Sequence, residues 1–456
     1  MGRRRDVKKR PRATGEQNQA GEDKPTMAPP NNSTAQAQIA LMIQVIDENI
    51  ETAQNLDQGI DRRFQMATAR DMGKEKYRHP IEFDVGGQFA FYDPDGGPYI
   101  QGNGPGYNQF IVVPVAGIMG VAKTELLARI EGAGTDRLLI AKPIARMLAK
   151  MKDKFAHTRN ALAQGFNQGL LGTVDASYAG GTVIQMANVP YGNRLLDINN
   201  QYQVTDANFN VQSVVTVLQK SLSTGGGVDT ITVDQLPIGG IAAGYQFIPM
   251  NAASGAPLGP QGLQYLISNS QNGDNCGIAR TIPYVQAPSV NASSTLNLGI
   301  ITVMNQRQNQ ALGSDQDDQK RFYYTHYVQQ ATADLLGFAK VMLVSDNGKQ
   351  NRFDIAPAKN LPWMIGNQEV LTDSMAGVDK LYDIAQGQLR KVRYPGSQKM
   401  IPGILEGIWW PRYQGGQATS ESDALFQDAY NFYTKLPWAH VYAYNIYVNP
   451  VMAAGV

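Results

Sequence analysis

One long helical segment restricts the fold of this chain more than any other feature. From Pro143 onward, apolar residues recur at three- and four-residue spacing until Gly172. The apolar positions are Ile144, Met147, Leu148, Met151, Phe155, Leu162, Phe166 and Leu170. Proline is favoured in the first helical turn and glycine just past the last. The pattern therefore predicts a helix over 143–171, about 43 Å long at a rise of ~1.5 Å per residue.

Strand-like segments precede and follow this helix. Between 81 and 125, the pieces IEFDV, QFAFY and QFIVVPV alternate with the turn clusters DPDGGP and GNGPG, which predicts a hairpin or a long excursion. Between 204 and 250, the pieces VQSVVTVLQKSL, DTITVDQL and YQFIPM predict the strands of a β-rich insertion. Because strands and helices do not alternate as a βαβ series, the fold class is α+β.

The C-terminal half contains both kinds of element. Periodicity predicts helices over 298–313 and 322–337 and another near 421–434, and the segment VYAYNIYV predicts a closing strand. Many aromatic residues follow Trp409. Since aromatic side chains bury large areas and tolerate a wet edge, we expect them to pack in the core and at interfaces.

The N-terminal region divides into a tail and an arm. Residues 1–33 contain no Leu, Ile, Phe, Tyr or Trp, so the tail cannot offset the entropy of ordering and is expected to be disordered when alone. From Ser33 or Thr34 as N-cap, apolar residues from Ile39 to Phe64 recur at helical spacing. This pattern predicts an amphipathic helical arm over 34–75.

The tail is strongly basic, although the whole chain has a formal charge of only +1. Residues 1–12 carry seven basic residues and one acid, a net charge of +6, which leaves about −5 on the remainder. The basic residues are Arg3, Arg4, Arg5, Lys8, Lys9, Arg10 and Arg12. They are candidates for contact with DNA phosphates or with an acidic surface of a neighbouring subunit or assembly protein, and a tail without a specific partner is the third alternative. Because no aromatic residue lies among them, base-specific recognition is not expected.

The sequence contains no motif that predicts catalysis, cofactor binding or metal binding. In FIVVPVAGIMGVAKTE, two residues separate Gly120 from Lys123, so the backbone and lysine do not have the spacing of a phosphate-binding loop. The histidines His79, His157, His326 and His440 are far apart in sequence, and we expect His157 to be solvated or at a subunit contact. We therefore predict that the protein is not an enzyme.

Cysteine usage and hydropathy bear on the compartment. Cys276 is the only cysteine, so it cannot form an intramolecular disulfide, which favours a reducing compartment. The basic start continues into polar residues, and no apolar stretch approaches membrane-spanning length. The protein is therefore expected to be soluble and unexported, without a membrane partner.

Three later segments carry a resemblance to a known family. These are GPQGLQYLISNSQNGDNCGIARTIPYVQAP (259–288), WMIGNQEVLTDSMAGVDKLYDIAQGQLRKV (363–392) and the ending AYNIYVNPVMAAG. In their order, and together with the excursion and the long helix, they resemble the capsid proteins of tailed bacteriophages with the Hong Kong ninety-seven-type fold, which encapsulins share. The resemblance covers roughly residues 75–456.

The resemblance implies an arrangement of domains along the chain. It assigns 1–33 to a basic disordered tail, 34–75 to a helical N-terminal arm, 76–140 to an extended loop region, 141–203 to a spine helix and the start of a peripheral domain, 204–250 to the β-rich insertion, 251–420 to the core of the peripheral and axial domains, and 421–456 to a C-terminal return to the peripheral domain.

The same resemblance implies a function in assembly. The chain would be a major capsid protein whose copies form the pentamers and hexamers of an icosahedral shell around double-stranded DNA, assembled in the host cytoplasm and located in the virion. Its partners would be other copies of itself, packaged DNA, a portal, and scaffolding or decoration proteins. Three alternatives remain: an encapsulin-type compartment that packs cargo enzymes, a nucleotide-dependent enzyme based on the segment near Lys123, and a β-rich tail or surface-binding protein.

Overall fold

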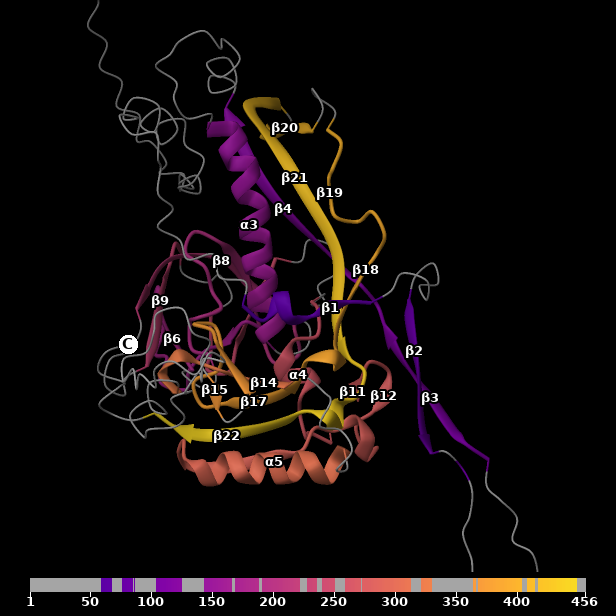
Figure 1. Ribbon diagram of the computed structural model, residues 1–456. Helices are drawn as coiled ribbons and strands as arrows, with labels where there is room; N and C mark the ends of the chain where they lie inside the picture. Colours follow the sequence, from indigo (N-terminus) through magenta and orange to yellow (C-terminus); the bar gives the residue numbers. More distant parts are fainter. Residues whose placement is uncertain are drawn as a thin grey trace, which may run out of the picture.

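Three six-stranded sheets form the body of the protein, with helix α3 beside one of them and helix α5 beside another (Figure 1). The computed structural model describes residues 59–67, 76–84, 86, 104–124, 143–165, 169–187, 191–221, 228–235, 240–250, 259–271, 273–312, 321–329, 364–365, 368–403, 408–414 and 417–448. No helix in these ranges is long and apolar enough to cross a membrane. The predicted basic tail and most of the predicted arm lie outside them.

The first sheet is built around one long strand. Its members are β1 (Gln65–Met66), β4 (Val115–Thr124), β18 (Leu389–Arg393), β19 (Lys399–Met400), β20 (Trp409–Gln414) and β21 (Gln417–Thr434). Strand β4 pairs with one edge of β21 in antiparallel register from Val115↔Tyr430 to Thr124↔Glu421. Strands β18, β19 and β20 follow one another along the opposite edge, and β1 is added in parallel outside β18.

Helix α3 (Pro143–Gln164) lies alongside β4 and β21. The Phe155 ring contacts the Phe426 and Tyr430 rings edge-on, at centroid distances of 5.1 and 6.2 Å. The structure confirms the predicted start of the helix but not its end at residue 171. At Gly165, an added Cβ would lie 2.6 Å from the Leu170 carbonyl oxygen, so the chain doubles back too tightly for the helix to continue.

The second sheet has the order β5-β10-β7-β8-β9-β6. Its strands are β5 (Gly172–Thr173), β6 (Val183–Met186), β7 (Gln201–Thr205), β8 (Val211–Ser221), β9 (Asp229–Val233) and β10 (Gln246–Pro249). The strands expected between 204 and 250 are therefore present. The sheet also takes in β5, β6 and the first three residues of β7, which precede residue 204, so the pairing extends beyond the segment predicted as an insertion.

The third sheet has the order β13-β22-β17-β14-β16-β15. Its strands are β13 (Ser289–Thr295), β14 (Arg321–Thr325), β15 (Met364–Ile365), β16 (Gln368–Thr372), β17 (Leu381–Ala385) and β22 (Val441–Tyr447). Helix α5 (Leu298–Leu312) packs beside β13 and β22 through the buried side chains of Ile300, Ile301 and Met304. The predicted helix at 298–313 and the predicted closing strand are confirmed.

Two hairpins complete the described fold. Strands β2 (Tyr77–Asp84) and β3 (Gly106–Val112) form an antiparallel ribbon that projects from the body at the lower right of Figure 1. Strands β11 (Asp274–Asn275) and β12 (Ile278–Ala279) form a small hairpin. It supports the base of the ribbon, since Ile111 N donates to the Cys276 carbonyl at 2.7 Å. The predicted excursion over 81–125 thus includes β2 and β3 but not β4, which belongs to the first sheet.

Two predicted helices are wrong where the structure describes them. Residues 421–434 lie in β21, because their side chains alternate between the α3 side and the opposite side and ten of them pair with β4. Residues 322–325 of the predicted helix at 322–337 lie in β14, and only residues 327–329 are helical before the described range ends. In both places strand pairing over long sequence distances overrides the local apolar spacing.

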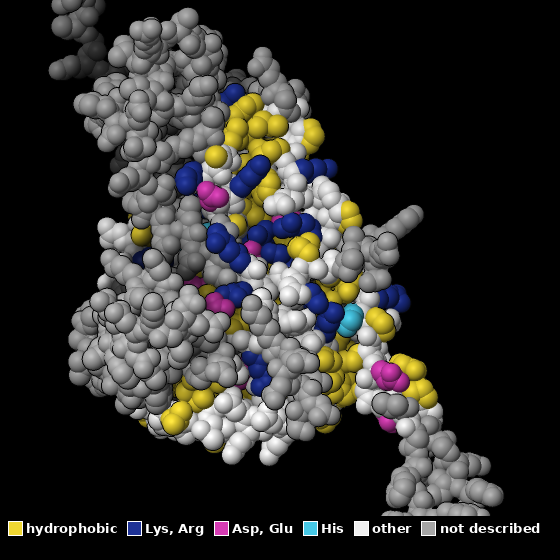
Figure 2. All heavy atoms as spheres, viewed as in Figure 1, with side chains coloured by type: hydrophobic (Ala, Val, Ile, Leu, Met, Phe, Trp, Pro, Cys, Tyr) yellow, Lys and Arg dark blue, Asp and Glu magenta, His cyan; other side chains and the backbone are white. Residues whose placement is uncertain are grey.

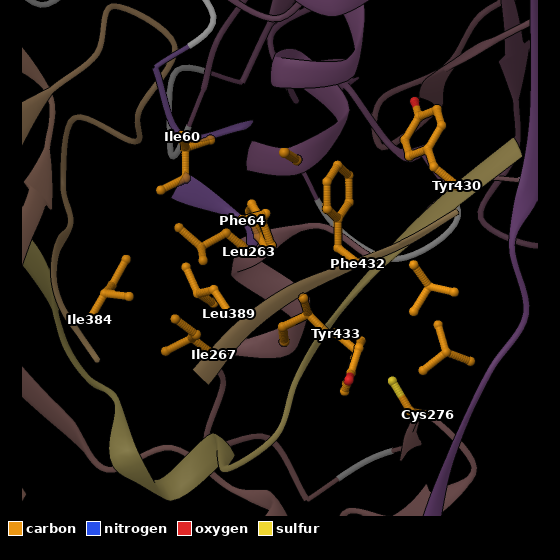
Figure 3. Close-up of a cluster of buried hydrophobic side chains, with 14 of the residues drawn as sticks. Ile60, Phe64, Leu263, Ile267, Cys276, Ile384, Leu389, Tyr430, Phe432 and Tyr433 are labelled. Atoms are coloured by element: carbon orange, nitrogen blue, oxygen red, sulfur yellow. The ribbon is translucent and has the colours of Figure 1, made fainter. Parts of the chain in front are cut away.

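The described end of the arm is not α-helical either. It consists of the 3₁₀ turn η1 (Asp61–Arg63) followed by β1. Figure 3 shows why it is ordered: Ile60 and Phe64 enter a buried cluster with Leu263, Leu389 and Phe432. The Phe64 and Phe432 ring centroids are 4.5 Å apart. Residues 34–58 and 68–75 of the predicted arm lie outside the described ranges.

Candidate functional site

A buried arginine joins the arm, helix α3 and the long strand β21. The Arg159 guanidinium donates two hydrogen bonds to the Asp61 carboxylate, from Nε at 2.8 Å and from Nη2 at 2.6 Å. Its Nη1 donates to Asp428 Oδ2 at 3.1 Å. All three residues are buried. One side chain of α3 therefore connects segments that are 98 and 269 residues away in sequence.

Two further cations from β18 complete this cluster. Lys391 Nζ lies 2.9 Å from Asp61 Oδ1, and Arg393 Nη2 lies 2.8 Å from Asp428 Oδ2. We call Asp61, Arg159, Lys391, Arg393 and Asp428 the junction cluster. It contains three cations and two carboxylates. Asp61 and Asp428 each pair with Arg159 of α3 and with a second cation from β18.

Burial and charge act in opposite directions on the pKa values of this cluster. Burial alone raises the pKa of Asp61, but the hydrogen bonds and charges of Arg159 and Lys391 outweigh it and keep that pKa below its usual value. Burial lowers the pKa of Lys391, and the Asp61 carboxylate offsets part of that effect. The ionised form of Asp61 is therefore the one that this site stabilises.

A second polar group attaches α3 to the third sheet. Asn160 Nδ2 and Gln164 Nε2 each donate to Asp373 Oδ2 at 3.0 Å, and the Tyr324 hydroxyl donates to the same oxygen at 3.0 Å. Asn160 Oδ1 accepts from the Asp61 backbone N–H at 3.0 Å. Since Asn160 is next to Arg159, the two polar groups form one continuous buried seam along the C-terminal half of α3.

The second sheet is connected to the same helix by His157. Its Nε2 lies 3.3 Å from Asp197 Oδ1, and both side chains are largely buried. Of the two alternatives expected for His157, solvation is therefore wrong, and a subunit contact stays a prediction. Its partner Asp197 lies between β6 and β7, and the polar residues Arg159, Asn160 and Gln164 of the same helix are buried as well.

These buried contacts fix α3 relative to the elements around it. Through Arg159, Gln164 and His157, helix α3 contacts the arm, β21 of the first sheet, β14 of the third sheet and the segment that precedes β7 of the second. Within the described ranges, no group of three or more His, Cys, Asp and Glu side chains could bind a metal ion. Lys123 lies in β4, and its Nζ is 4.0 Å from the Trp409 ring centroid. The lysine of the segment compared above with a phosphate-binding loop therefore makes a cation–π contact within the first sheet.

The sequence prediction did not identify the junction cluster. The candidate residues Arg3, Arg4, Arg5, Lys8, Lys9, Arg10 and Arg12 lie outside the described ranges, so their role stays a prediction. One signal was present in the sequence: Arg159 follows Met151 and Phe155 at four-residue spacing, which places a charged residue on the apolar side of the predicted helix. A charge in that position requires a buried partner.

A separate buried acid lies in the third sheet. Asp383 of β17 is fully buried, and neither carboxylate oxygen has a hydrogen-bond partner among the described residues. Burial raises its pKa to about 7, although the charge of Arg321 and the amide of Gln308 act to lower it. Arg321 instead donates to Gln308 Oε1 at 2.7 Å. The nearby His440 has a pKa lowered by burial to about 3, so it is neutral near pH 7.

Replacement of Asp383 by asparagine is expected to change how stability depends on pH. Because the folded pKa is raised above the unfolded one, the folded protein binds the extra proton between about pH 4 and 7, and wild-type stability falls as pH rises through that window. Asp383→Asn removes this loss. The difference in unfolding free energy, variant minus wild type, should rise by roughly 2 to 4 kcal/mol between pH 5 and 8.

Urea titrations of both proteins at several pH values measure this difference. Asp153→Asn, on the exposed side of α3, is the matched control and should give a difference nearly independent of pH. A flat difference for Asp383→Asn as well would show that the Asp383 carboxyl is not protonated in the folded protein near neutral pH.

Comparison with known proteins gives structural but not sequence matches. No protein-family model matches the sequence, and no curated protein matches it. The structure is similar to that in a cyanophage A-1(L) capsid asymmetric unit, with a TM-score of 0.50 and 9% identity over 88% of this chain and 95% of that one. The capsid of a native GTA particle gives a TM-score of 0.45 and 7% identity over 88% and 94%, and Gordonia phage Cozz gives 0.43 and 9% over 90% and 93%.

Proposed function

We propose that this chain, whose fold is that of tailed-phage capsid proteins, is a major capsid protein that assembles into a closed shell. The observation that carries the proposal is the match to the cyanophage capsid chain, which spans 88% of this chain and 95% of the other. Such coverage means that the likeness extends over most of both chains. A shared local motif would cover far less.

The surface of the described residues supports a role in self-association. The β2–β3 ribbon leaves the body and exposes large apolar side chains, with Phe83 47% and Tyr107 65% exposed. Ile118 on β4 is 62% exposed on the side of the first sheet away from α3. Exposed apolar surface of this kind marks contact sites, and the same chain in many copies would cover it repeatedly.

The finer parts of the proposal concern the assembly and its contents. Copies of the chain form pentamers and hexamers of an icosahedral shell, which encloses double-stranded DNA and includes a portal and scaffolding or decoration proteins. The shell is assembled in the host cytoplasm and becomes part of the virion. Each contact is weak by itself, but a subunit attached to several neighbours at once is retained strongly. The junction cluster would transmit movement between the arm and the sheets during assembly.

Sedimentation and negative-stain imaging of the expressed chain test this function. Closed shells or capsomer rings are the expected result, with the chain alone or together with a scaffolding protein. Particles filled with a folded enzyme would instead favour an encapsulin-type compartment. A monomer that forms no particles under either condition would exclude the proposed function.

Replacement of Tyr107 tests whether the ribbon takes part in assembly. Because Tyr107 is 65% exposed, Tyr107→Ser should change the thermal midpoint by less than about 2 °C. It should nevertheless lower the yield of shells, since the apolar contact with a neighbour is lost. Analytical ultracentrifugation gives the shell fraction, and differential scanning calorimetry gives the midpoint. An unchanged shell fraction would show that this side chain does not contribute to assembly.

A further inference from the structure

Basic side chains gather at one edge of the first sheet. The sequence from residue 384 to 405, which contains β18 and β19, has four basic residues and no acid. Lys399 of β19 is exposed, and Arg390 and Arg393 of β18 are half-buried. Lys435, just after β21, lies near Arg390. Burial and the charge of Arg390 both lower the pKa of Lys435. We call Arg390, Arg393, Lys399 and Lys435, with the exposed Arg62 of η1, the basic edge.

Of the basic edge, Arg393 pairs with the buried Asp428, whereas Arg390, Lys399 and Lys435 have no acidic partner among the described residues. The two acids beneath it, Asp61 and Asp428, are buried and are already shared among Arg159, Lys391 and Arg393. Three cations facing two carboxylates leave an excess positive charge in that cluster. In Figure 2, dark blue side chains run down the middle of the visible face, with only a few magenta ones between them.

The local charge contrasts with the rest of the protein. Outside residues 1–12 the chain carries a net charge of about −5, so the basic edge is a local feature of the folded surface. Neutral hydrogen-bond donors accompany the cations there. Gln65 and Gln398 are exposed and accept from Arg390 and Arg393 through their side-chain oxygens, so their amide N–H groups can donate to a ligand. Cations with neutral donors along an edge match the backbone of a nucleic acid, which arginine, lysine, serine and glutamine side chains all contact.

We propose that the basic edge binds the phosphates of double-stranded DNA and is the surface that the subunit turns toward the interior of the shell. The inference rests on the proposed function. Attraction of this kind is independent of base sequence and decreases steeply with salt, because each phosphate contact releases bound counterions. This DNA contact would belong to the folded body and would be separate from any contact made by the basic tail.

The test measures binding of unassembled full-length protein to a 40-base-pair duplex of random sequence by fluorescence anisotropy, at ~50 to 300 mM salt. The variant Arg390→Gln/Lys399→Gln/Lys435→Gln keeps the tail, so any difference from wild type comes from the edge. We expect affinity at ~100 mM salt to fall about 10- to 100-fold, and the slope of log K against log salt to decrease by roughly 2 to 3. Arg307→Gln, at an exposed cation of α5, is the control and should bind as wild type does.

Alternative outcomes separate this proposal from the proposed function. Wild-type affinity and salt slope in the triple variant would overturn the proposal, and shells formed by that variant would leave the capsid function intact. A variant that binds DNA normally but no longer forms shells would show that the edge contacts another subunit, which also overturns the proposal. Because Arg390 is half-buried, Arg62→Gln/Lys399→Gln, at two exposed positions, gives a second test in which the slope should decrease by about 1 to 2.

Discussion

Replacement of Arg159 by leucine is expected to lower the free energy of unfolding by about 3 to 5 kcal/mol. The substitution removes two hydrogen bonds to Asp61 and one to Asp428, both of which are buried. Each carboxylate keeps one cation, but Asp61 loses its bidentate partner. Removal of one member of a buried ionic group is costly because the remaining charge has left water without full compensation.

Urea unfolding of the unassembled subunit, followed by tryptophan fluorescence, measures this effect. Lys150→Leu is the control on the same helix, since its side chain is 47% exposed and its ion pair with Asp153 is 3.5 Å long. That change should stay within about 0.5 kcal/mol. The effects of Asp61→Asn and Arg159→Leu should be non-additive by about 0.5 to 3 kcal/mol, because the two side chains share two hydrogen bonds that either substitution disrupts. A cost below ~1 kcal/mol for Arg159→Leu would show that the junction cluster does not stabilise the fold.

Replacement of Phe432 by alanine should cost about 3 to 5 kcal/mol, because it leaves a cavity where three elements meet. Phe432 is fully buried, and its ring lies 4.5 Å from the Phe64 ring and 5.5 Å from the Tyr430 ring. Phe64 belongs to the arm and Phe432 to β21, so their contact attaches the arm to the first sheet through apolar packing (Figure 3).

A double-mutant cycle with Phe64→Ala gives the size of that contact. The two changes should be non-additive by about 0.5 to 3 kcal/mol, since both residues line one cavity. The control is Tyr413→Ala on β20, where the ring is 63% exposed and the expected change is within about 0.5 kcal/mol. Additive effects of Phe64→Ala and Phe432→Ala would mean that the arm packs independently of β21.

These two predictions bear on function because both concern the attachment of the arm. Ionic contacts to Arg159 and Lys391 and apolar contacts to Phe432 fix the same nine-residue stretch, 59–67. If the arm and ribbon reach neighbouring subunits, as the proposed function requires, their attachment to the body must withstand the forces of assembly. Variants at either contact should therefore form fewer shells than their loss of subunit stability alone would cause.

The sequence by itself determined the elements whose residues interact locally. The start of α3 followed from Pro143 and an apolar stripe at helical spacing, and helix α5 followed from the same kind of pattern. Turn clusters between β-prone pieces predicted the β2–β3 ribbon and the strands of the second sheet. Those signals lie within ten to twenty residues of each other, where backbone preferences and periodicity act directly.

Only the tertiary structure decided the elements and contacts that depend on distant partners. The segment 421–434 has apolar spacing that suits a helix, yet it is a strand because β4, some 300 residues earlier, pairs with it through ten residues. The junction cluster brings together Asp61, Arg159 and Asp428, and no pattern along the chain states that these three meet. Local spacing sets what each segment can form, whereas long-range pairing and the need to neutralise buried charge select among those possibilities once the chain is compact.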